Sequence, residues 1–316
     1  MGFDSKRSPG RRQSILGRAL GFDLENPARA AAGLVHLLSK ANDDGHVFLP
    51  RGALLEQAAA LLGETAPAAE QLTALVAERR LLDDGGAIYL NLMHALEVEL
   101  AHGLRARTTH HAERLVPDPA LYERTSGLTL APAQRAALEL AAEAPIMVLT
   151  GGPGTGKTTI VRAVLHLFRQ LDGEILLAAP TGRAARRLTE TTGAQASTLH
   201  RLLGYHPIEG FRHDEENPLT AAAVVVDEAS MLDQALTIAL LRALPAEARI
   251  LFVGDADQLP SVGPGNVLAD LLASGEVPSV RLTEIFRQAE ASDIVLNAHR
   301  ILEGRTPLPT PKGTES

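Results

Sequence analysis

The chain contains 316 residues with a formal net charge of −8, 45% apolar residues and no cysteine. The lack of cysteine excludes disulfides, thiolate metal sites and cysteine nucleophiles, and it suits a reducing compartment, so we expect a cytoplasmic protein. No apolar run approaches the ~20 residues of a membrane-spanning helix, and we therefore expect no membrane partner.

The N-terminal third predicts a small, mainly helical domain over residues 26–116. The preceding residues 1–25 are basic and aperiodic, so we expect them to be loosely ordered. Apolar spacing then predicts a helix from Pro27, helices over 51–62 and 68–80, and a β-hairpin that turns at Asp84-Gly85-Gly86. A long helix over 93–107 follows, with a domain boundary at Pro117 and Pro119. This winged-helix-like outline is either a DNA-facing module or a structural spacer.

From residue 128 to residue 303 the chain alternates between short apolar runs and helical segments. The predicted strands cover residues 145–150, 174–179, 222–227 and 248–253. This alternation predicts an α/β domain with a parallel sheet and helices on both faces. Ligands of such sheets bind at the carboxyl ends of the strands, where the polar motifs of this chain lie. Residues 304–316 are rich in proline, and we expect an extended tail.

A phosphate-binding loop follows the first of these strands. The sequence Gly151-Gly152-Pro153-Gly154-Thr155-Gly156-Lys157-Thr158 fits G-x-x-x-x-G-K-[ST] between a predicted strand and a predicted helix. Its backbone N–H groups can form a nest for phosphate oxygens, while Lys157 reaches the β- and γ-phosphates and Thr158 ligates Mg²⁺. The predicted cofactors are ATP and Mg²⁺, and the predicted nucleotide contacts here are Gly152, Pro153, Gly154, Thr155, Gly156, Lys157, Thr158 and Thr159.

Other strand ends carry groups suited to phosphoryl chemistry. Asp227 suits a Mg²⁺ site and Glu228 suits a water-polarising base, although a pair of solvated acids is the alternative. Gln258, within Gly254-Asp255-Ala256-Asp257-Gln258-Leu259-Pro260, is either a γ-phosphate contact or part of a polar turn. Arg287 is either an arginine finger or a surface ion-pairing residue. We predict catalytic roles for Lys157, Asp227, Glu228, Gln258 and Arg287.

In this order along the chain, the motifs resemble those of the RecD-type superfamily-1 helicases, the family of the exodeoxyribonuclease V alpha subunit. The resemblance rests on residues 151–158, on Ala179-Pro180-Thr181-Gly182-Arg183-Ala184-Ala185, and on residues 227–230, 254–260 and 286–288. It implies a P-loop, RecA-like motor domain over residues 128–303. It also implies an ATP-dependent helicase that moves 5′→3′ on single-stranded DNA and acts at junctions with duplex. The sequence identifies no recombination or repair subunit that would join it.

The resemblance also implies roles for single residues. Gln134 matches the position that contacts the adenine edge, with a solvated helix glutamine as the alternative. DNA contacts are implied for six residues in two segments: Pro180, Thr181, Gly182, Arg183, Thr198 and His200. Hydroxyls, backbone N–H groups and arginines are the usual phosphate-contacting groups. Arg186 and Arg187 lie on the same predicted helix, and they either contact DNA or belong to a solvated face.

Helicases of this family have a second RecA-like domain, and the sequence stops at Ser316, where that domain would begin. We therefore expect a fragment that binds MgATP and single-stranded DNA weakly and has low activity alone. Two other interpretations remain open. One is a non-motor ATP-binding switch or assembly module, and the other is a small-molecule kinase, which the basic segment after Pro180 disfavours.

Overall fold

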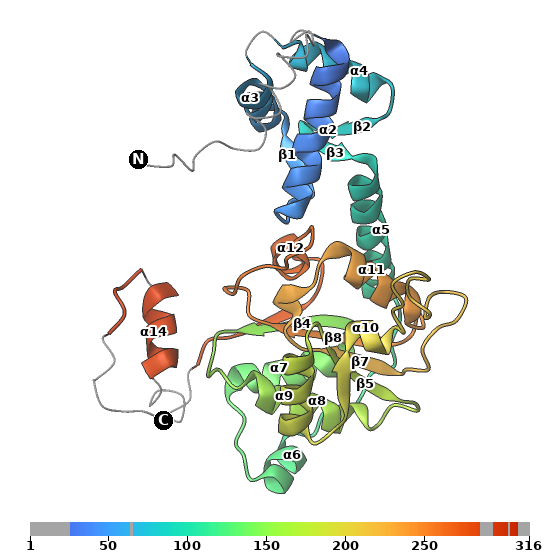
Figure 1. Ribbon diagram of the computed structural model, residues 1–316. Helices are drawn as coiled ribbons and strands as arrows, with labels where there is room; N and C mark the ends of the chain where they lie inside the picture. Colours follow the sequence, from blue (N-terminus) through green and yellow to red (C-terminus); the bar gives the residue numbers. More distant parts are fainter. Residues whose placement is uncertain (1–25, 64–65, 285–292, 303, 309–316) are drawn as a thin grey trace. The chain divides into compact units, whose positions relative to one another are not determined.

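The computed structural model describes residues 26–63, 66–284, 293–302 and 304–308 (Figure 1). The chain divides into two compact units, Met1–Glu99 with Val262–Gly265 and Leu100–Ser261 with Asn266–Ser316. The predicted N-terminal segment 1–25, residues 309–316 of the predicted tail and Arg287 lie outside the described residues. Within the described ranges, no helix combines the length and the apolar character that a membrane crossing requires.

The first unit consists of helices packed on a small antiparallel sheet. Its elements are α2 (Pro27–Asp43), β1 (Phe48–Pro50), α3 (Arg51–Leu62), α4 (Ala68–Ala77), β2 (Leu81–Asp84), β3 (Ala87–Leu90) and the start of α5 (Asn91–Thr108). The strand order is β1-β3-β2, and both pairs are antiparallel. The core includes Leu34, Leu38, Leu54, Leu72 and Ile88, all fully buried. The predicted helices and hairpin are present, although the helix predicted over 68–80 ends at Ala77, and the short strand β1 is an addition.

Local signals account for the bounds of these elements. The Asn26 side chain accepts a hydrogen bond from the N–H of Ala28 at 2.9 Å, directly before the proline that opens α2. The β2–β3 turn consists of Gly85 and Gly86, with φ of 59° and 93°. A two-residue hairpin turn with two positive φ angles matches the strand twist and strongly favours glycine, which fixes the register of this hairpin.

The second unit is built on a six-stranded parallel sheet of order β6-β5-β7-β8-β4-β9. Helices α7, α8 and α9 lie on one face, and α11 and α12 lie on the other (Figure 1). This arrangement confirms the predicted fold class. The elements after α5 are α6 (Pro119–Ser126), α7 (Pro132–Glu143), β4 (Ile146–Gly151), α8 (Lys157–Phe168), β5 (Ile175–Ala179), α9 (Gly182–Thr192), β6 (Ala196–Thr198), α10 (Leu199–Leu202), β7 (Ala223–Val226), the 3₁₀ turn η1 (Ala229–Met231), α11 (Gln234–Ala243), β8 (Arg249–Gly254), α12 (Val267–Ser274), β9 (Ser279–Leu282) and α14 (Asp293–Leu302).

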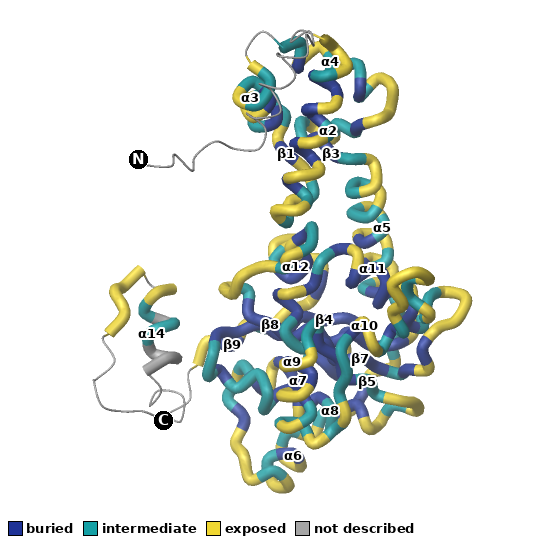
Figure 2. The backbone as a smooth tube through the Cα atoms, viewed as in Figure 1, coloured by how far each residue is buried: buried dark blue, intermediate teal, exposed yellow. Residues whose placement is uncertain are grey.

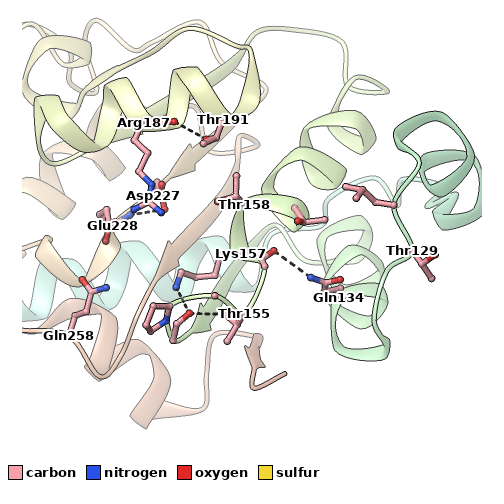
Figure 3. A pocket seen from close by; sticks show the side chains of 16 residues that line it. Thr129, Gln134, Thr155, Lys157, Thr158, Arg187, Thr191, Asp227, Glu228 and Gln258 are labelled. Atoms are coloured by element: carbon pink, nitrogen blue, oxygen red, sulfur yellow. Dashed lines mark hydrogen bonds between the residues drawn. The ribbon is translucent and has the colours of Figure 1, made fainter. Parts of the chain in front are cut away.

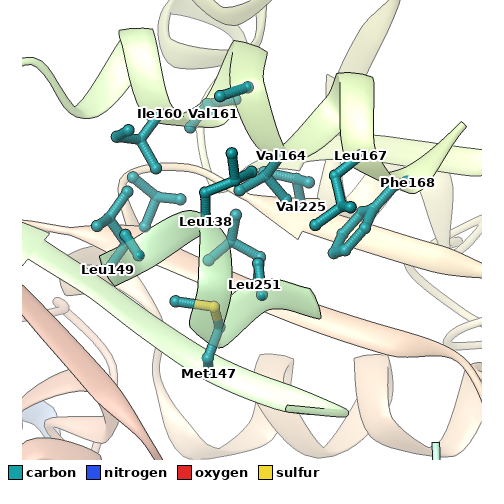
Figure 4. Close-up of a cluster of buried hydrophobic side chains, with 14 of the residues drawn as sticks. Leu138, Met147, Leu149, Ile160, Val161, Val164, Leu167, Phe168, Val225 and Leu251 are labelled. Carbon is teal, nitrogen blue, oxygen red and sulfur yellow. The ribbon is translucent and has the colours of Figure 1, made fainter. Parts of the chain in front are cut away.

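The core of this unit lies between the sheet and the helices α7 and α8. Every residue of β4 and β8 is buried (Figure 2), which is the pattern expected of central strands covered on both faces. Leu138 of α7 and Val161 and Phe168 of α8 pack with Leu149 and Leu251 of these strands (Figure 4). This packing holds the carboxyl ends of neighbouring strands in a fixed row, and the motif loops follow those ends.

The division between the two units falls inside α5, between Glu99 and Leu100, rather than at Pro117 and Pro119. The reason is a buried arginine in the second half of α5. The Arg107 guanidinium donates hydrogen bonds to the carbonyl oxygens of Leu241, Leu244 and Pro245, each at 2.8 Å. These carbonyls lie at the C-terminal end of α11, so the end of α5 belongs to the second unit.

Candidate functional site

The loop between β4 and α8 has the geometry of an anion cradle. Gly154 and Gly156 both have φ of 80°, a left-handed conformation that favours glycine. The buried Thr155 hydroxyl donates to the Gly152 carbonyl at 2.8 Å and ties the loop to itself. A Cβ on Gly151 would lie 2.7 Å from the backbone oxygen of Leu282 in β9, so side-chain bulk is excluded there. The loop leads directly into the N-terminus of α8, whose free N–H groups favour anions.

The Lys157 ammonium lies within this loop. Its Nζ donates to the carbonyl oxygens of Gly151 at 2.5 Å and Gly152 at 3.0 Å (Figure 3). Burial lowers the pKa of Lys157, and the nearby carboxylates, with Asp255 the strongest, oppose that shift. The side chain therefore folds back onto its own loop, and its charged end lies beside the loop carbonyls.

Two carboxylates follow β7. Asp227 accepts a hydrogen bond from the N–H of Glu228 at 3.0 Å. Glu228 has φ 54° and ψ 43°, a left-handed conformation that is uncommon for residues other than glycine, asparagine and aspartate. Burial raises the pKa of Asp227, and burial followed by repulsion from Asp227 raises the pKa of Glu228. Backbone strain of this kind concentrates at functional sites, and here it directs a partly buried carboxylate into the site.

A third loop follows β8 and is braced from several sides. The buried Asp255 carboxylate accepts hydrogen bonds from the N–H of Asp257 at 3.1 Å and the Nε2 of Gln258 at 3.3 Å. The N–H of Ala256 donates to the Thr150 hydroxyl of β4 at 3.2 Å, which joins this loop to the strand that carries the glycine-rich loop. Asp257 pairs with Arg281 of β9 at 2.6 Å. The Gln258 amide is thus held at the mouth of the site by Asp255.

Gln134 of α7 is buried, with 2% of its surface exposed, so the solvated-helix alternative does not hold. Its Oε1 accepts from the N–H of Ala131 at 3.0 Å, and its Nε2 donates to the Gly156 carbonyl at 3.5 Å. The amide therefore bridges the start of α7 and the glycine-rich loop.

These groups face one cavity of about 750 Å³ (Figure 3). Of the residues singled out from the sequence, it is lined by Gln134, Gly152, Pro153, Gly154, Thr155, Gly156, Lys157, Thr158, Thr159, Asp227, Glu228 and Gln258. Four further residues complete the lining: Leu128, Thr129, Arg187 and Thr191. The sequence left Arg187 between DNA contact and a solvated helix face, and it did not indicate Leu128, Thr129 or Thr191.

The donor set of the cavity fits Mg²⁺ bound together with phosphate. In the part of the chain that the structure describes, no group of three or more His, Cys, Asp or Glu side chains can hold a metal by itself. The Thr158 hydroxyl and the Asp227 carboxylate nevertheless line the same cavity. Mg²⁺ is usually held by one or two protein oxygens, with waters and substrate phosphates completing the shell. A nucleotide-dependent Mg²⁺ site therefore suits these residues better than a metal site built by the protein alone.

The two segments expected to contact DNA follow neighbouring strands. In the β5–β6 pair, Ala179 lies opposite Thr198, so the segment from Pro180 to Arg183 and the segment from Thr198 leave the same edge of the sheet. Two threonines cap the helices that follow: the hydroxyl of Thr181 accepts from the N–H of Ala184, and that of Thr198 accepts from the N–H of Arg201, both at 3.2 Å.

An aromatic cluster lies beside the second segment. The His200 ring is 5.3 Å from the ring of Tyr205 and 6.0 Å from that of Phe211, and the latter two rings are 5.1 Å apart. Tyr205 is 48% exposed. Sequence reasoning missed this cluster, because Phe211 lies in a loop and joins the other two rings only through the folded turn.

A glycine-rich loop between β4 and α8, carboxylates after β7 and a parallel sheet with helices on both faces define a P-loop, RecA-like nucleotide-binding module. A family model described as an AAA domain matches residues 134–264. The ATP-dependent RecD2 DNA helicase of Deinococcus radiodurans is 39% identical over 309 residues, which cover 92% of this chain and 43% of that protein. The RecBCD enzyme subunit RecD of Mycobacterium tuberculosis is 39% identical over 274 residues, which cover 77% of this chain and 44% of that protein.

The chain belongs to the RecD-type superfamily-1 helicases. It spans less than half the length of these two curated relatives. Among solved structures, the chain is similar to the Pif1 helicase of Candida albicans, with a TM-score of 0.43 and 22% identity over 59% of this chain and 50% of that one.

Proposed function

We propose that this chain is the ATP-binding part of a RecD-type DNA helicase, which couples MgATP hydrolysis to 5′→3′ movement on single-stranded DNA and to unwinding at junctions with duplex. The observation that carries the proposal is that Lys157, Glu228 and Gln258 line one cavity although they follow three different strands. A phosphate-binding loop with a base and a polar amide beside it is the set of groups that an NTP hydrolase uses.

Several of the residues that line the cavity have separate roles in the proposed reaction. Lys157 leaves the carbonyls of its own loop and binds the β- and γ-phosphates. Thr158 and Asp227 hold Mg²⁺, which supplies charge neutralisation of the phosphates when bound. Glu228 orients the attacking water and accepts its proton, and its raised pKa makes the ionised carboxylate a stronger base. Gln258 contacts the γ-phosphate, and Gln134 contacts the adenine edge.

DNA contact is proposed for the two segments at the β5–β6 edge. Pro180, Thr181, Gly182 and Arg183 belong to the first segment, and Thr198 and His200 belong to the second. Backbone N–H groups at the start of α9, together with hydroxyls and arginine, suit phosphates of a single strand. The half-exposed Tyr205 ring adds a surface on which a base can stack without sequence preference.

The test of this function is nucleotide binding and ATP turnover with and without single-stranded DNA. Lys157→Ala should abolish binding of a fluorescent ATP analogue, because it removes the charge that faces the phosphates. Lys40→Ala is the matched control, since Lys40 lies on α2, outside the cavity. Stimulation of turnover by single-stranded DNA supports the helicase assignment. ATP binding with DNA-independent turnover favours the non-motor module instead, and unchanged binding in Lys157→Ala refutes the nucleotide site.

A further inference from the structure

Arg187 gives the nucleotide cavity a second cation, on the side opposite the glycine-rich loop. It lies on α9, and its side chain points from that helix toward Asp227 (Figure 3). It lines the cavity together with Lys157, Asp227 and Glu228. Its neighbour Arg186 is different: its Nε pairs with Glu190 at 2.9 Å, its side chain is 82% exposed, and it does not line the cavity. Two adjacent arginines therefore have separate surroundings.

The charges around Arg187 indicate that its guanidinium is available for a ligand. Within the described part of the chain, the guanidinium has no hydrogen-bond or ion-pair partner. It nevertheless lies close enough to Asp227 and Glu228 to favour their ionised forms, against the effect of burial. A planar guanidinium beside a cavity that holds phosphates can donate two parallel hydrogen bonds to phosphate oxygens.

The position of Arg187 in the cavity indicates which end of a bound nucleotide it would contact. Gln134 and Thr129 line the cavity from the α7 side, whereas Asp227 and Glu228 line the end where the proposed chemistry takes place. Arg187 is directed to this second end (Figure 3). A cation here meets the terminal phosphate and lies far from the base.

We propose that Arg187 binds the terminal phosphate of the nucleotide from the α9 side, opposite Lys157, and thereby makes the site prefer ATP over ADP. This inference rests on the proposed nucleotide site. It has a structural consequence for α9, since the N-terminus of the same helix carries Thr181 and Arg183. The terminal phosphate would hold, through Arg187, the helix whose first turn is proposed to contact DNA.

The experiment is a fluorescence titration of a non-hydrolysable ATP analogue and of ADP, each with Mg²⁺, against the wild-type chain and three variants. Arg187→Ala should lose roughly tenfold or more in affinity for the ATP analogue, the range expected for hydrogen bonds to a charged group. Its affinity for ADP should stay within about twofold. Arg187→Lys should retain part of the preference, because charge remains but the bidentate geometry is lost. Arg186→Ala, one residue away, should behave as wild type.

A parallel titration with single-stranded DNA in nucleotide-free buffer distinguishes the other role for Arg187. Arg187→Ala could instead keep the wild-type ratio of ATP to ADP affinity, weaken DNA binding, and make the slope of log K against log salt concentration shallower by about one. That result would mean that Arg187 contacts DNA and that the proposal is wrong. An unchanged ratio with unchanged DNA binding also overturns it. In both cases tight wild-type nucleotide binding that Lys157→Ala abolishes leaves the nucleotide site itself intact. Absence of nucleotide binding by the folded wild-type chain refutes both proposals together.

Discussion

Replacement of Arg107 by methionine should destabilise the second unit. Arg107 is 8% exposed, and its guanidinium closes the C-terminal end of α11 by donating to the carbonyls of Leu241, Leu244 and Pro245 at 2.8 Å. The last carbonyls of a helix have no partner within the helix, and a cation there also interacts favourably with the helix dipole. Methionine fills a similar volume but donates nothing, so these oxygens would be left without their donor.

The size of the effect follows from these contacts. Hydrogen bonds to a charged group contribute about 1.5–3 kcal/mol each, but those of Arg107, which include a longer one to the Ala246 carbonyl at 3.5 Å, share one side chain and do not add. The variant also avoids the cost of burying the guanidinium, which is visible in the lowered pKa of Arg107. We therefore expect a loss of about 1–3 kcal/mol in the free energy of unfolding, the range for buried acceptors that are left without a donor. For a unit of this size that corresponds to a fall in Tm of about 2–12 °C.

The assay is chemical and thermal unfolding followed by circular dichroism. Arg107→Lys should lie between wild type and Arg107→Met, because one ammonium cannot reach all three carbonyls. Arg105→Met is the matched control: Arg105 lies two residues away on α5 and is exposed, so its loss should change the free energy by less than about 0.5 kcal/mol. The reasoning is refuted if Arg107→Met unfolds within 0.5 kcal/mol of the control.

Three further outcomes are expected. Glu228→Gln should bind a fluorescent ATP analogue within about twofold of wild type but lose about 10²–10⁴ in DNA-stimulated turnover, whereas Glu190→Gln on α9 should lose nothing; near wild-type turnover would exclude Glu228 as the base. Burial raises the pKa of Glu228, so ionisation of this carboxyl lowers the stability of the folded state as pH rises. Glu228→Gln should therefore be more stable than wild type at pH 7, and its advantage in the free energy of unfolding should be smaller near pH 4. Unfolding measured as a function of pH checks this. Gly151→Ala should cost about 1–3 kcal/mol in urea unfolding, since its Cβ would meet the Leu282 carbonyl, whereas Gly182→Ala, which opens onto free space, should cost nothing.

The central strands could be predicted from the sequence because they are buried on both faces. The predicted strands at 145–150 and 248–253 differ by one residue at each end from Ile146–Gly151 and Arg249–Gly254. A short, continuous apolar run of this kind favours a buried strand over other structures. The strands β6 and β9 were not predicted, because they have three and four residues and are mostly half-exposed or exposed. Their formation depends on pairing with β5 and β4, which no local pattern reports.

The site was predictable where one short segment carries both the geometry and the chemistry. The glycine-rich loop and the Asp227-Glu228 pair are of this kind. Arg187 was not, because its place in the cavity depends on the strand order β5-β7-β8-β4, and this order sets α9 beside the loops that follow β7 and β4. The resting contacts of Lys157 and Gln258, each held by a neighbouring loop atom, were equally absent from the sequence pattern.

The strand order also has a consequence for local opening of the sheet. Strand β4, which carries the nucleotide loop, is hydrogen-bonded on both sides, by β8 and β9, and is buried throughout. Strand β6, which leads to Thr198 and His200, is a three-residue edge strand paired with β5 alone. Amide hydrogen exchange should therefore be slowest in β4 and β8 and much faster in β6. Strand β6 and the proposed DNA-contacting segment that follows it can then open and close in fluctuations that leave β4, and with it the nucleotide loop, in place.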